Sequence, residues 1–231
     1  MTAPAERHWY SLPRWTAALR SLAAGVATVV ILAILFVVLG DVIVEDKRVA
    51  LDRSVDGEVH ELASHNLTTA MRWVTDLGAA PITVIVFLGM IGWLLWRHRK
   101  RDAVLVTISW FGAQLLDFSL KDVYHRNRPE LFSPFVHTTG YSFPSGHTTT
   151  ALVTYGLLAY LVVHLLHGWV RVVPVLVAIA LVVAVAFSRV YLGAHYFTDV
   201  LGSVLMGGAW LRASLLAWTH LDRPREVVGD G

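Results

Sequence analysis

Hydrophobic segments with few charged residues recur along the chain at lengths that match a lipid bilayer. The hydrocarbon core is about 30 Å thick, so one helical crossing needs about 20 apolar residues. We expect six crossings, near residues 21–43, 77–96, 103–121, 147–166, 171–188 and 195–218. The pattern predicts an all-α, multi-pass membrane protein, a six-transmembrane-helix bundle that forms a single domain over residues 1–231. Residues 219–231 are expected to form a short cytoplasmic tail.

The composition also fits a membrane protein. Hydrophobic residues make up 55% of the 231 residues and charged residues only 16%, more apolar than a soluble domain needs. The absence of Cys excludes a disulfide framework, a thiolate nucleophile and a Cys-based metal site. With a net charge of only +2, we expect no nucleic-acid partner and basic loops that face anionic lipid. The first hydrophobic run is longer than a signal-peptide core and is expected to be a retained anchor.

The short basic loops predict an orientation in the cell membrane. The densest basic cluster, Arg97 to Arg101, lies between the second and third expected crossings. Loops rich in Lys and Arg stay in the cytoplasm, so this loop and both termini are expected there. The two long connections, 41–76 and 122–146, are then on the extracytoplasmic side.

The first of these connections has an amphipathic pattern. Val55, Val59 and Leu62 recur at helical spacing with charged residues between them. Such a pattern suits a helix in the membrane interface, and equally a lid packed on the bundle. For the segment 45–76 both interpretations stay open.

Residues that could carry chemistry occur in three clusters. The clusters are Lys121 with Arg128, the run Pro144-Ser145-Gly146-His147, and the segment from Ser188 and Arg189 to His195 and Asp199. Forty residues lie between His147 and Ser188, about 60 Å of helix, which is two crossings. The chain therefore returns to the side that it left, and the three clusters are expected to meet at one extracytoplasmic mouth.

The cations at this mouth predict an anionic ligand. Arg pairs two oxygens at once and Lys supplies a point charge, so Lys121, Arg128 and Arg189 suit a phosphoryl group. The turn at 144–146 would bring backbone N–H groups and the Ser145 hydroxyl toward the same anion. No metal and no cofactor are expected, because three adjacent cations repel a divalent ion.

The histidines predict the reaction. Asp199 follows His195 by one turn of the expected sixth helix and can accept a proton from one ring nitrogen, which leaves the other as a nucleophile. His147 is the expected general acid for the departing oxygen. Asp117 is expected to pair with Lys121 one turn later, or alternatively to form a hydrogen bond with a neighbouring helix.

Together the three clusters resemble the signature motifs of the type 2 phosphatidic acid phosphatase superfamily, complete and in order. The resemblance covers about residues 103–218 and implies metal-independent dephosphorylation in a six-helix membrane bundle, through a phosphohistidine at His195. It also implies His147 as the acid and Asp199 as the orienting carboxylate. The phosphate-binding residues that it implies are Lys121, Arg128, Ser145, Gly146, Ser188 and Arg189.

The function that this predicts is a lipid phosphatase or pyrophosphatase whose substrate comes from the bilayer. A polyprenyl pyrophosphate, undecaprenyl or decaprenyl, is the first expectation, with phosphatidylglycerophosphate and phosphatidic acid as alternatives. A vanadate-dependent haloperoxidase fits less well because of the six crossings. A non-enzymatic lipid-phosphate binder fits less well because the pair His195 and Asp199 is intact. Protein partners and oligomeric state stay open.

Overall fold

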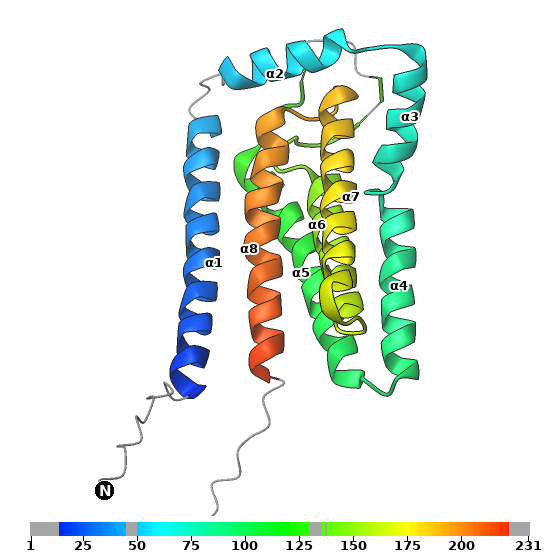
Figure 1. Cartoon of the computed structure of the whole chain (residues 1–231). Coiled ribbons are helices and arrows are strands. Elements are labelled where there is room, and N and C mark those ends of the chain that lie inside the picture. Colours follow the sequence, from blue (N-terminus) through cyan, green and yellow to red (C-terminus); the bar gives the residue numbers. More distant parts are fainter. Residues whose placement is uncertain (1–13, 45–49, 130–134, 137, 222–231) are drawn as a thin grey trace, which may run out of the picture.

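The computed structural model describes residues 14–44, 50–129, 135–136 and 138–221, and it is helical throughout these residues apart from turns and loops (Figure 1). The elements are α1 (Arg14–Val44), α2 (Ala50–Glu61), α3 (His65–Asp76), α4 (Ala80–Trp96), α5 (Lys100–Tyr124), α6 (Gly146–Val163), η1 (Gly168–Arg171), α7 (Val172–Tyr191) and α8 (Phe197–Leu221). The prediction of an all-α fold is confirmed. Residues 222–231 of the expected cytoplasmic tail lie outside the described residues.

Six segments of the described chain are long and apolar enough to cross a membrane. They are Leu19–Val44, His65–Trp96, Lys100–Tyr124, Gly146–Val163, Gly168–Tyr191 and Phe197–Thr219. Each overlaps one of the expected crossings, so the prediction of a six-helix bundle is confirmed. Many large apolar side chains on these helices, Ile31 and Leu88 among them, are exposed, as expected for surfaces that face lipid.

The second crossing is made of two helices rather than one. α3 and α4 follow each other with a break at residues 77–79, and Pro81 stands in the first turn of α4. Proline is accepted there because the first N–H groups of a helix have no partner within the helix. The expected connection at 41–76 therefore holds the end of α1, all of α2 and all of α3.

α2 lies across one end of the bundle, which we call the α2 end (Figure 1). Its apolar side chains Val55 and Val59 are half-buried, and two carboxylates on the same face, Asp52 and Asp56, are buried. Both carboxylates accept hydrogen bonds from the first residues of α8. Of the two interpretations of the segment 45–76, packing on the bundle describes α2.

α6 is the central helix of the bundle and packs against α4, α5, α7 and α8. Its side chains Val153 and Leu157 are fully buried in the main apolar core. The same core contains stacked rings of Phe87 from α4 and Trp110 from α5, with ring centroids 4.8 Å apart. This core fixes the central helix that begins with the Gly146-His147 motif.

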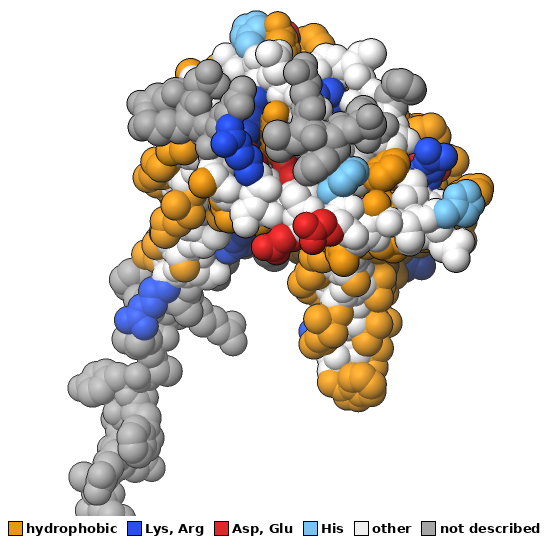
Figure 2. All heavy atoms as spheres, turned by 90° about the horizontal axis from the view of Figure 1, so that it is seen from above, with side chains coloured by type: hydrophobic (Ala, Val, Ile, Leu, Met, Phe, Trp, Pro, Cys, Tyr) orange, Lys and Arg blue, Asp and Glu red, His pale blue; other side chains and the backbone are white. Residues whose placement is uncertain are grey.

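The helix ends that carry the sequence motifs all lie at the α2 end. α5 and α7 end there, and α6 and α8 begin there, whereas the connection from α4 to α5 lies at the opposite end (Figure 1). Seen onto the α2 end, charged and histidine side chains gather on the end itself and apolar side chains cover the flanks (Figure 2). The predicted convergence of the three clusters is thus a feature of the fold.

Candidate active site

The three clusters are brought together by four helix ends. Lys121 lies in the last turn of α5 and Arg128 in the segment that follows. Ser145 precedes α6, and Gly146 and His147 begin it. Ser188 and Arg189 lie in the last turn of α7, His195 in the turn after it, and Asp199 in the first turn of α8. His147 lies within electrostatic range of Lys121, Arg128, Arg189 and His195. The structure therefore brings charged residues of all three clusters together around His147.

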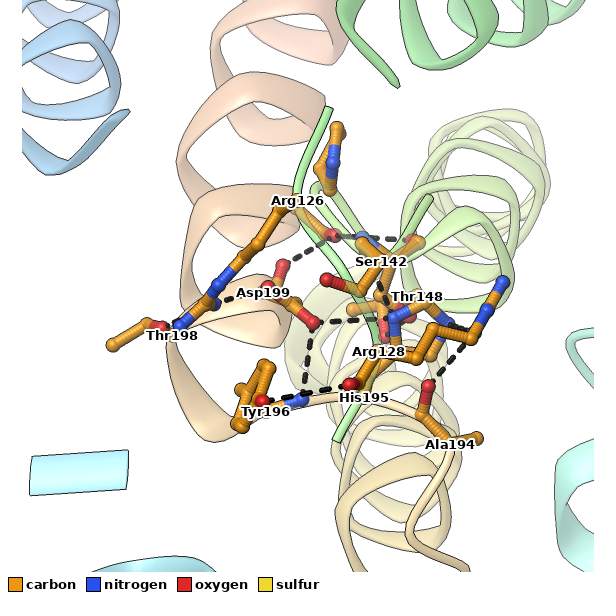
Figure 3. A network of polar contacts seen from close by, with 12 residues as sticks. Arg126, Arg128, Ser142, Thr148, Ala194, His195, Tyr196, Thr198 and Asp199 are labelled. Carbon is orange, nitrogen blue, oxygen red and sulfur yellow. Dashed lines mark hydrogen bonds and ion pairs between the residues drawn. The ribbon is translucent and has the colours of Figure 1, made fainter. Parts of the chain in front are cut away.

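His195 is buried, and its two ring nitrogens have different surroundings (Figure 3). Nδ1 lies 2.8 Å from the carbonyl oxygen of Ser142 and 3.4 Å from Oδ2 of Asp199. Both neighbours are acceptors, so Nδ1 carries the proton and Nε2 is unprotonated, with a lone pair that can accept a hydrogen bond or attack an electrophile. Burial lowers the pKa of His195 to about 4, with Asp199 opposing the shift, and the ring is neutral at neutral pH.

The expectation that His195 and Asp199 share a helix is wrong. α8 begins at Phe197, and His195 belongs to the turn before it. The helix begins there because Oδ2 of Asp199 accepts a hydrogen bond from the backbone N–H of Tyr196, at 3.0 Å. A carboxylate in this position binds a free N–H group of the first turn. Asp199 still reaches back to the histidine, but Ser142 provides the nearer acceptor.

Arg128 lies beside the unprotonated nitrogen of His195. Its Nη1 is 3.3 Å from Nε2 and donates to the carbonyl of Ala194 at 2.7 Å. Nε and Nη2 donate to the carbonyls of Gly140 and Thr139, at 3.0 and 2.9 Å. Burial lowers the pKa of Arg128, yet a guanidinium remains charged at neutral pH. This arginine therefore fixes the loop and places a positive charge next to the nucleophile.

Lys121 connects α5 to the turn before α6. Its Nζ donates to Oδ2 of Asp117 at 2.6 Å and to the carbonyl of Pro144 at 2.7 Å. The predicted pairing of Asp117 with Lys121 is confirmed. Gly146 allows this approach, because a Cβ there would lie 3.0 Å from the same carboxylate oxygen.

The turn at Ser145 is held by α8. The N–H of Ser145 lies 2.6 Å from Oγ of Ser203 and 3.3 Å from the carbonyl of Asp199. Its hydroxyl accepts a hydrogen bond from Thr148 at 3.1 Å. This N–H was expected to approach an anion and is instead engaged within the protein. The turn thereby ties the start of α6 to the helix that carries Asp199.

Arg189 supplies a buried cation from α7. Only 3% of it is exposed, and Nη1 donates to Oγ1 of Thr75 on α3 at 2.9 Å. Its Nε has no hydrogen-bond partner among the described residues. The neighbouring Ser188 hydroxyl donates to the carbonyl of Val185 in its own helix, at 2.6 Å. Arg189 therefore has an unused buried donor, whereas the hydroxyl proton of Ser188 is already engaged.

The side chains of the site suit an anion with several oxygens. Lys121, Arg128 and Arg189 come from three directions, and charge-assisted hydrogen bonds from such groups are the strong contacts to phosphate. Within the described ranges, no group of three or more His, Asp or Glu side chains is arranged to hold a metal ion.

Several residues of the site were missed from the sequence. The carbonyl of Ser142, the hydroxyl of Ser203 and the hydroxyl of Thr75 each hold a predicted residue in place. A backbone carbonyl has no signature in residue type, and Ser and Thr are common in loops and helices. The buried carboxylates of α2 did leave a signal, because Asp52 and Asp56 share the apolar face of an amphipathic pattern.

Comparisons with known proteins show the family of the chain. The family model of the PAP2 superfamily matches residues 102–223. Phosphatidylglycerophosphatase B of Bacillus subtilis (strain 168) is 37% identical over an alignment of 148 positions, which covers 61% of this chain and 70% of that protein. Undecaprenyl-diphosphatase BcrC of the same strain is 29% identical over an alignment of 175 positions, which covers 71% of this chain and 84% of that protein.

A solved structure shares the fold as well. The crystal structure of a transmembrane PAP2 type phosphatidylglycerolphosphate phosphatase from Bacillus subtilis has a TM-score of 0.72 and 30% identity, and covers 86% of this chain and 98% of that one. The fold and the site define a multi-pass membrane enzyme of the lipid phosphatase class, as the motifs predicted. The chain belongs to the PAP2 superfamily.

Proposed function

We propose that the chain hydrolyses a lipid phosphate or pyrophosphate through a phosphohistidine at His195. The observation that carries this proposal is the unprotonated Nε2 of a neutral, buried histidine, which accepts a hydrogen bond of 3.3 Å from Nη1 of Arg128. Nδ1 is held by Ser142 and Asp199, so the ring cannot turn without losing both partners. A nucleophile held in this way meets the geometric requirement for covalent catalysis.

In the proposed first step, Nε2 of His195 attacks the terminal phosphorus while the bond from that phosphorus to the leaving oxygen breaks; this is the lipid oxygen in a monophosphate and the bridging oxygen in a pyrophosphate. His147 donates a proton to that oxygen, and Asp199 stabilises the positive charge that develops on the imidazole. In the second step, water attacks phosphorus and the N–P bond breaks. His147 accepts the proton of the water, and inorganic phosphate leaves.

The proposed phosphate contacts come from the three cations. Arg189 has an unpartnered buried Nε, and Arg128 lies next to Nε2 of His195. Lys121 holds the turn of Ser145 and Gly146 through the carbonyl of Pro144. In this role the cations stabilise the charge of the transferring phosphoryl group from fixed positions, which requires no metal ion.

The first substrate that we propose is a polyprenyl pyrophosphate. When its terminal phosphoryl group is transferred, the leaving group is the lipid monophosphate, which is a better leaving group than an alkoxide. Its isoprenoid chain stays in the bilayer. The relative undecaprenyl-diphosphatase BcrC supports this choice. Phosphatidylglycerophosphate is the second candidate, favoured by the 37% identity with phosphatidylglycerophosphatase B.

We propose that the site faces the extracytoplasmic side. The support is the short loop of Arg97, His98 and Arg99, which joins α4 to α5 at the end of the bundle opposite the site. Basic loops of this length stay in the cytoplasm. A substrate would then reach the site from the outer leaflet.

The test is phosphate release by the purified protein in detergent micelles from a panel of lipids. The panel contains undecaprenyl pyrophosphate, phosphatidylglycerophosphate and phosphatidic acid, each with and without EDTA. We expect release from at least one lipid, unchanged by EDTA and absent in His195→Ala. Release that stops with EDTA and returns with Mg²⁺, or that persists in His195→Ala, would contradict the proposal. The ratio of kcat/KM values between lipids decides the substrate.

A further inference from the structure

Arg126 holds the side of Asp199 that faces away from His195 (Figure 3). Its Nη1 is bonded to Oδ1 of Asp199 and donates to Oγ1 of Thr198 at 2.8 Å. The guanidinium also lies over the ring of Tyr196, 4.1 Å from the centroid. Asp199 thus gives one oxygen to Arg126 and the other to the N–H of Tyr196 and to His195.

A carboxylate of α2 holds Arg126 in turn. Nη2 of Arg126 donates to Oδ2 of Asp52 at 2.7 Å. Asp52 also accepts from the N–H and the hydroxyl of Thr198, at 2.9 and 2.8 Å. A negative charge at the start of α8 is favoured by the helix dipole and by the free N–H groups of its first turn. Only 3% of Asp52 is exposed, so this ion pair is protected from water.

The backbone next to Arg126 supports the second partner of His195. The N–H of Ser142 donates to the carbonyl of Arg126 at 2.8 Å, and the Ser142 hydroxyl donates to the carbonyl of Asn127 at 3.0 Å. The carbonyl of the same serine accepts from Nδ1 of His195. Residues 126–127 therefore hold both acceptors of that proton, Asp199 by a side chain and Ser142 by the backbone.

We propose that Arg126 and Asp52 are positioning residues of the active site, with Arg126 orienting Asp199 toward His195 and Asp52 orienting Arg126. The proposal rests on the proposed function of His195 as the nucleophile. A buried carboxylate whose two oxygens each have hydrogen-bond partners is held in one orientation. Without Arg126, Asp199 is an uncompensated buried anion that can turn to form a closer ion pair with His195. Such a pair favours the imidazolium, which has no lone pair for attack.

Arg126 stays positively charged in its buried position. Although burial opposes it, the carboxylates of Asp199 and Asp52 raise the pKa of Arg126. The titratable and charged groups that face His195 from the surrounding elements are Asp199, Arg128, Arg189 and His147. Arg126 acts on His195 through the first of these, so its removal leaves the other three unchanged.

The experiment compares Arg126→Gln, Arg126→Lys and Asp52→Asn with the wild-type protein, using a lipid that the wild type hydrolyses. The control is Arg53→Gln, an exposed neighbour of Asp52 on α2. Each variant is measured for thermal unfolding, for kcat and KM, and for the dependence of kcat/KM on pH, which reports the free enzyme.

We expect Arg126→Gln to lower kcat by about 10–100-fold, as loss of a residue that orients a site residue does, with KM changed less than about threefold. The acid limb of its pH profile moves to higher pH, because less of His195 is neutral at low pH. Arg126→Lys keeps the charge and the acid limb, with an intermediate kcat. Asp52→Asn should lower kcat and move the acid limb to higher pH, both by less than Arg126→Gln does. The double variant with Arg126→Gln should resemble Arg126→Gln alone, since Asp52 acts through Arg126.

A folded Arg126→Gln with the kcat and acid limb of Arg53→Gln would overturn the positioning role. If Arg126→Gln does not fold, Arg126→Lys and Asp52→Asn decide, and wild-type kcat in both overturns it. A wild-type protein that releases no phosphate from any lipid overturns the proposed function and this inference together. An active wild type with unaffected variants overturns the inference alone.

Discussion

Asp117 and Lys121 form an ion pair one helical turn apart on α5, with 2.6 Å between Oδ2 and Nζ. The pair lies in the last turns of the helix, and the ammonium group also donates to the carbonyl of Pro144 before α6. Two contacts from one ammonium leave one N–H of Lys121 for a ligand. The carboxylate thereby fixes the direction in which the third hydrogen points.

Asp117→Asn should raise KM for a lipid phosphate by about tenfold, which is about 1.4 kcal/mol of binding, and change kcat less. An amide is uncharged, so Lys121 is held less firmly toward the site. The measurement is steady-state kinetics in micelles, with Asp122→Asn as the control because Asp122 is exposed on the same helix. Equal KM values in the two variants would show that the pair has no part in binding.

The proposed roles of the two histidines predict different responses to the leaving group. His195→Ala should lower kcat by about 10⁴-fold or more for every substrate, because the nucleophile is lost. His147→Ala should slow a lipid with an alkoxide leaving group by about 10²–10⁴-fold and an activated aryl phosphate much less, since the latter departs without a proton. Trapping of the phosphoenzyme by rapid quench checks both. Equal losses for the two substrates in His147→Ala would remove the acid role.

Substitution of Gly78 by Ala should displace His147. It lies at the break between α3 and α4, and a Cβ there would lie 2.9 Å from the carbonyl oxygen of His147 and 2.6 Å from Cγ1 of Val185. A backbone oxygen cannot rotate away, so Gly78→Ala should displace the start of α6. We expect a loss of about 1–3 kcal/mol of stability, as for other overpacked sites, and a lower kcat.

The chain offers a matched control for this change. Gly89 lies on α4, where a Cβ would meet nothing within 4 Å, so Gly89→Ala should keep both activity and unfolding temperature. Thermal unfolding and kcat with the aryl phosphate and the lipid complete the comparison. Wild-type values in Gly78→Ala would mean that the junction adjusts without moving His147.

The sequence predicted the crossings and their meeting point because both follow from fixed dimensions. A helix rises about 1.5 Å per residue and a bilayer core is about 30 Å thick, so the spacing from His147 to Ser188 determines on which side both lie. Residue type then indicated the chemistry, since Lys, Arg, His and Asp are rare within crossings and usually functional there. The Asp117–Lys121 pair could also be predicted from fixed dimensions, because residues one turn apart on a helix are neighbours.

The contacts between elements could not be predicted in this way. The nearest acceptor of His195 is a backbone carbonyl, that of Ser142, and its position depends on how residues 125–145 fold back. Arg126 is one of many basic residues in the sequence, and only the packing of α2 on α8 shows that it joins Asp52 to Asp199. The start of α8 was placed two residues too early, because a side-chain cap decided it and the apolar pattern did not.

The proposed orientation predicts which loops are accessible from outside the cell. The chain has no Cys, so Thr138→Cys and His98→Cys each introduce a single thiol. Thr138 is a half-buried loop residue next to Thr139, whose carbonyl accepts a hydrogen bond from Arg128 of the site, whereas His98 is exposed in the loop between α4 and α5. In intact cells, an impermeant maleimide should label position 138 and not position 98. Labelling of position 98 alone would reverse the orientation and exclude an outer-leaflet substrate.

The buried carboxyl group of Asp56 should make the stability of the protein depend on pH. It is buried on α2; Oδ1 accepts from the N–H of Phe197 at 3.2 Å, and Oδ2 has no partner among the described residues. Burial, with the negative charge of Asp52 adding to it, raises the pKa of Asp56 from 3.8 to about 7. Since the folded pKa lies above the unfolded one, the folded state binds more protons between these values, and stability falls as pH rises through that window.

Asp56→Asn removes this titration while keeping the shape of the side chain. We expect the variant to unfold at nearly the wild-type temperature at pH 5, where Asp56 is protonated, and at a higher temperature than wild type at pH 8. The gain should be about 2–4 °C for each kcal/mol recovered. Thermal unfolding in detergent at pH 5, 6.5 and 8 measures it, with Glu58→Gln on the exposed face of α2 as the control. A difference between variant and wild type that stays constant from pH 5 to 8 would mean that Asp56 does not titrate in this range.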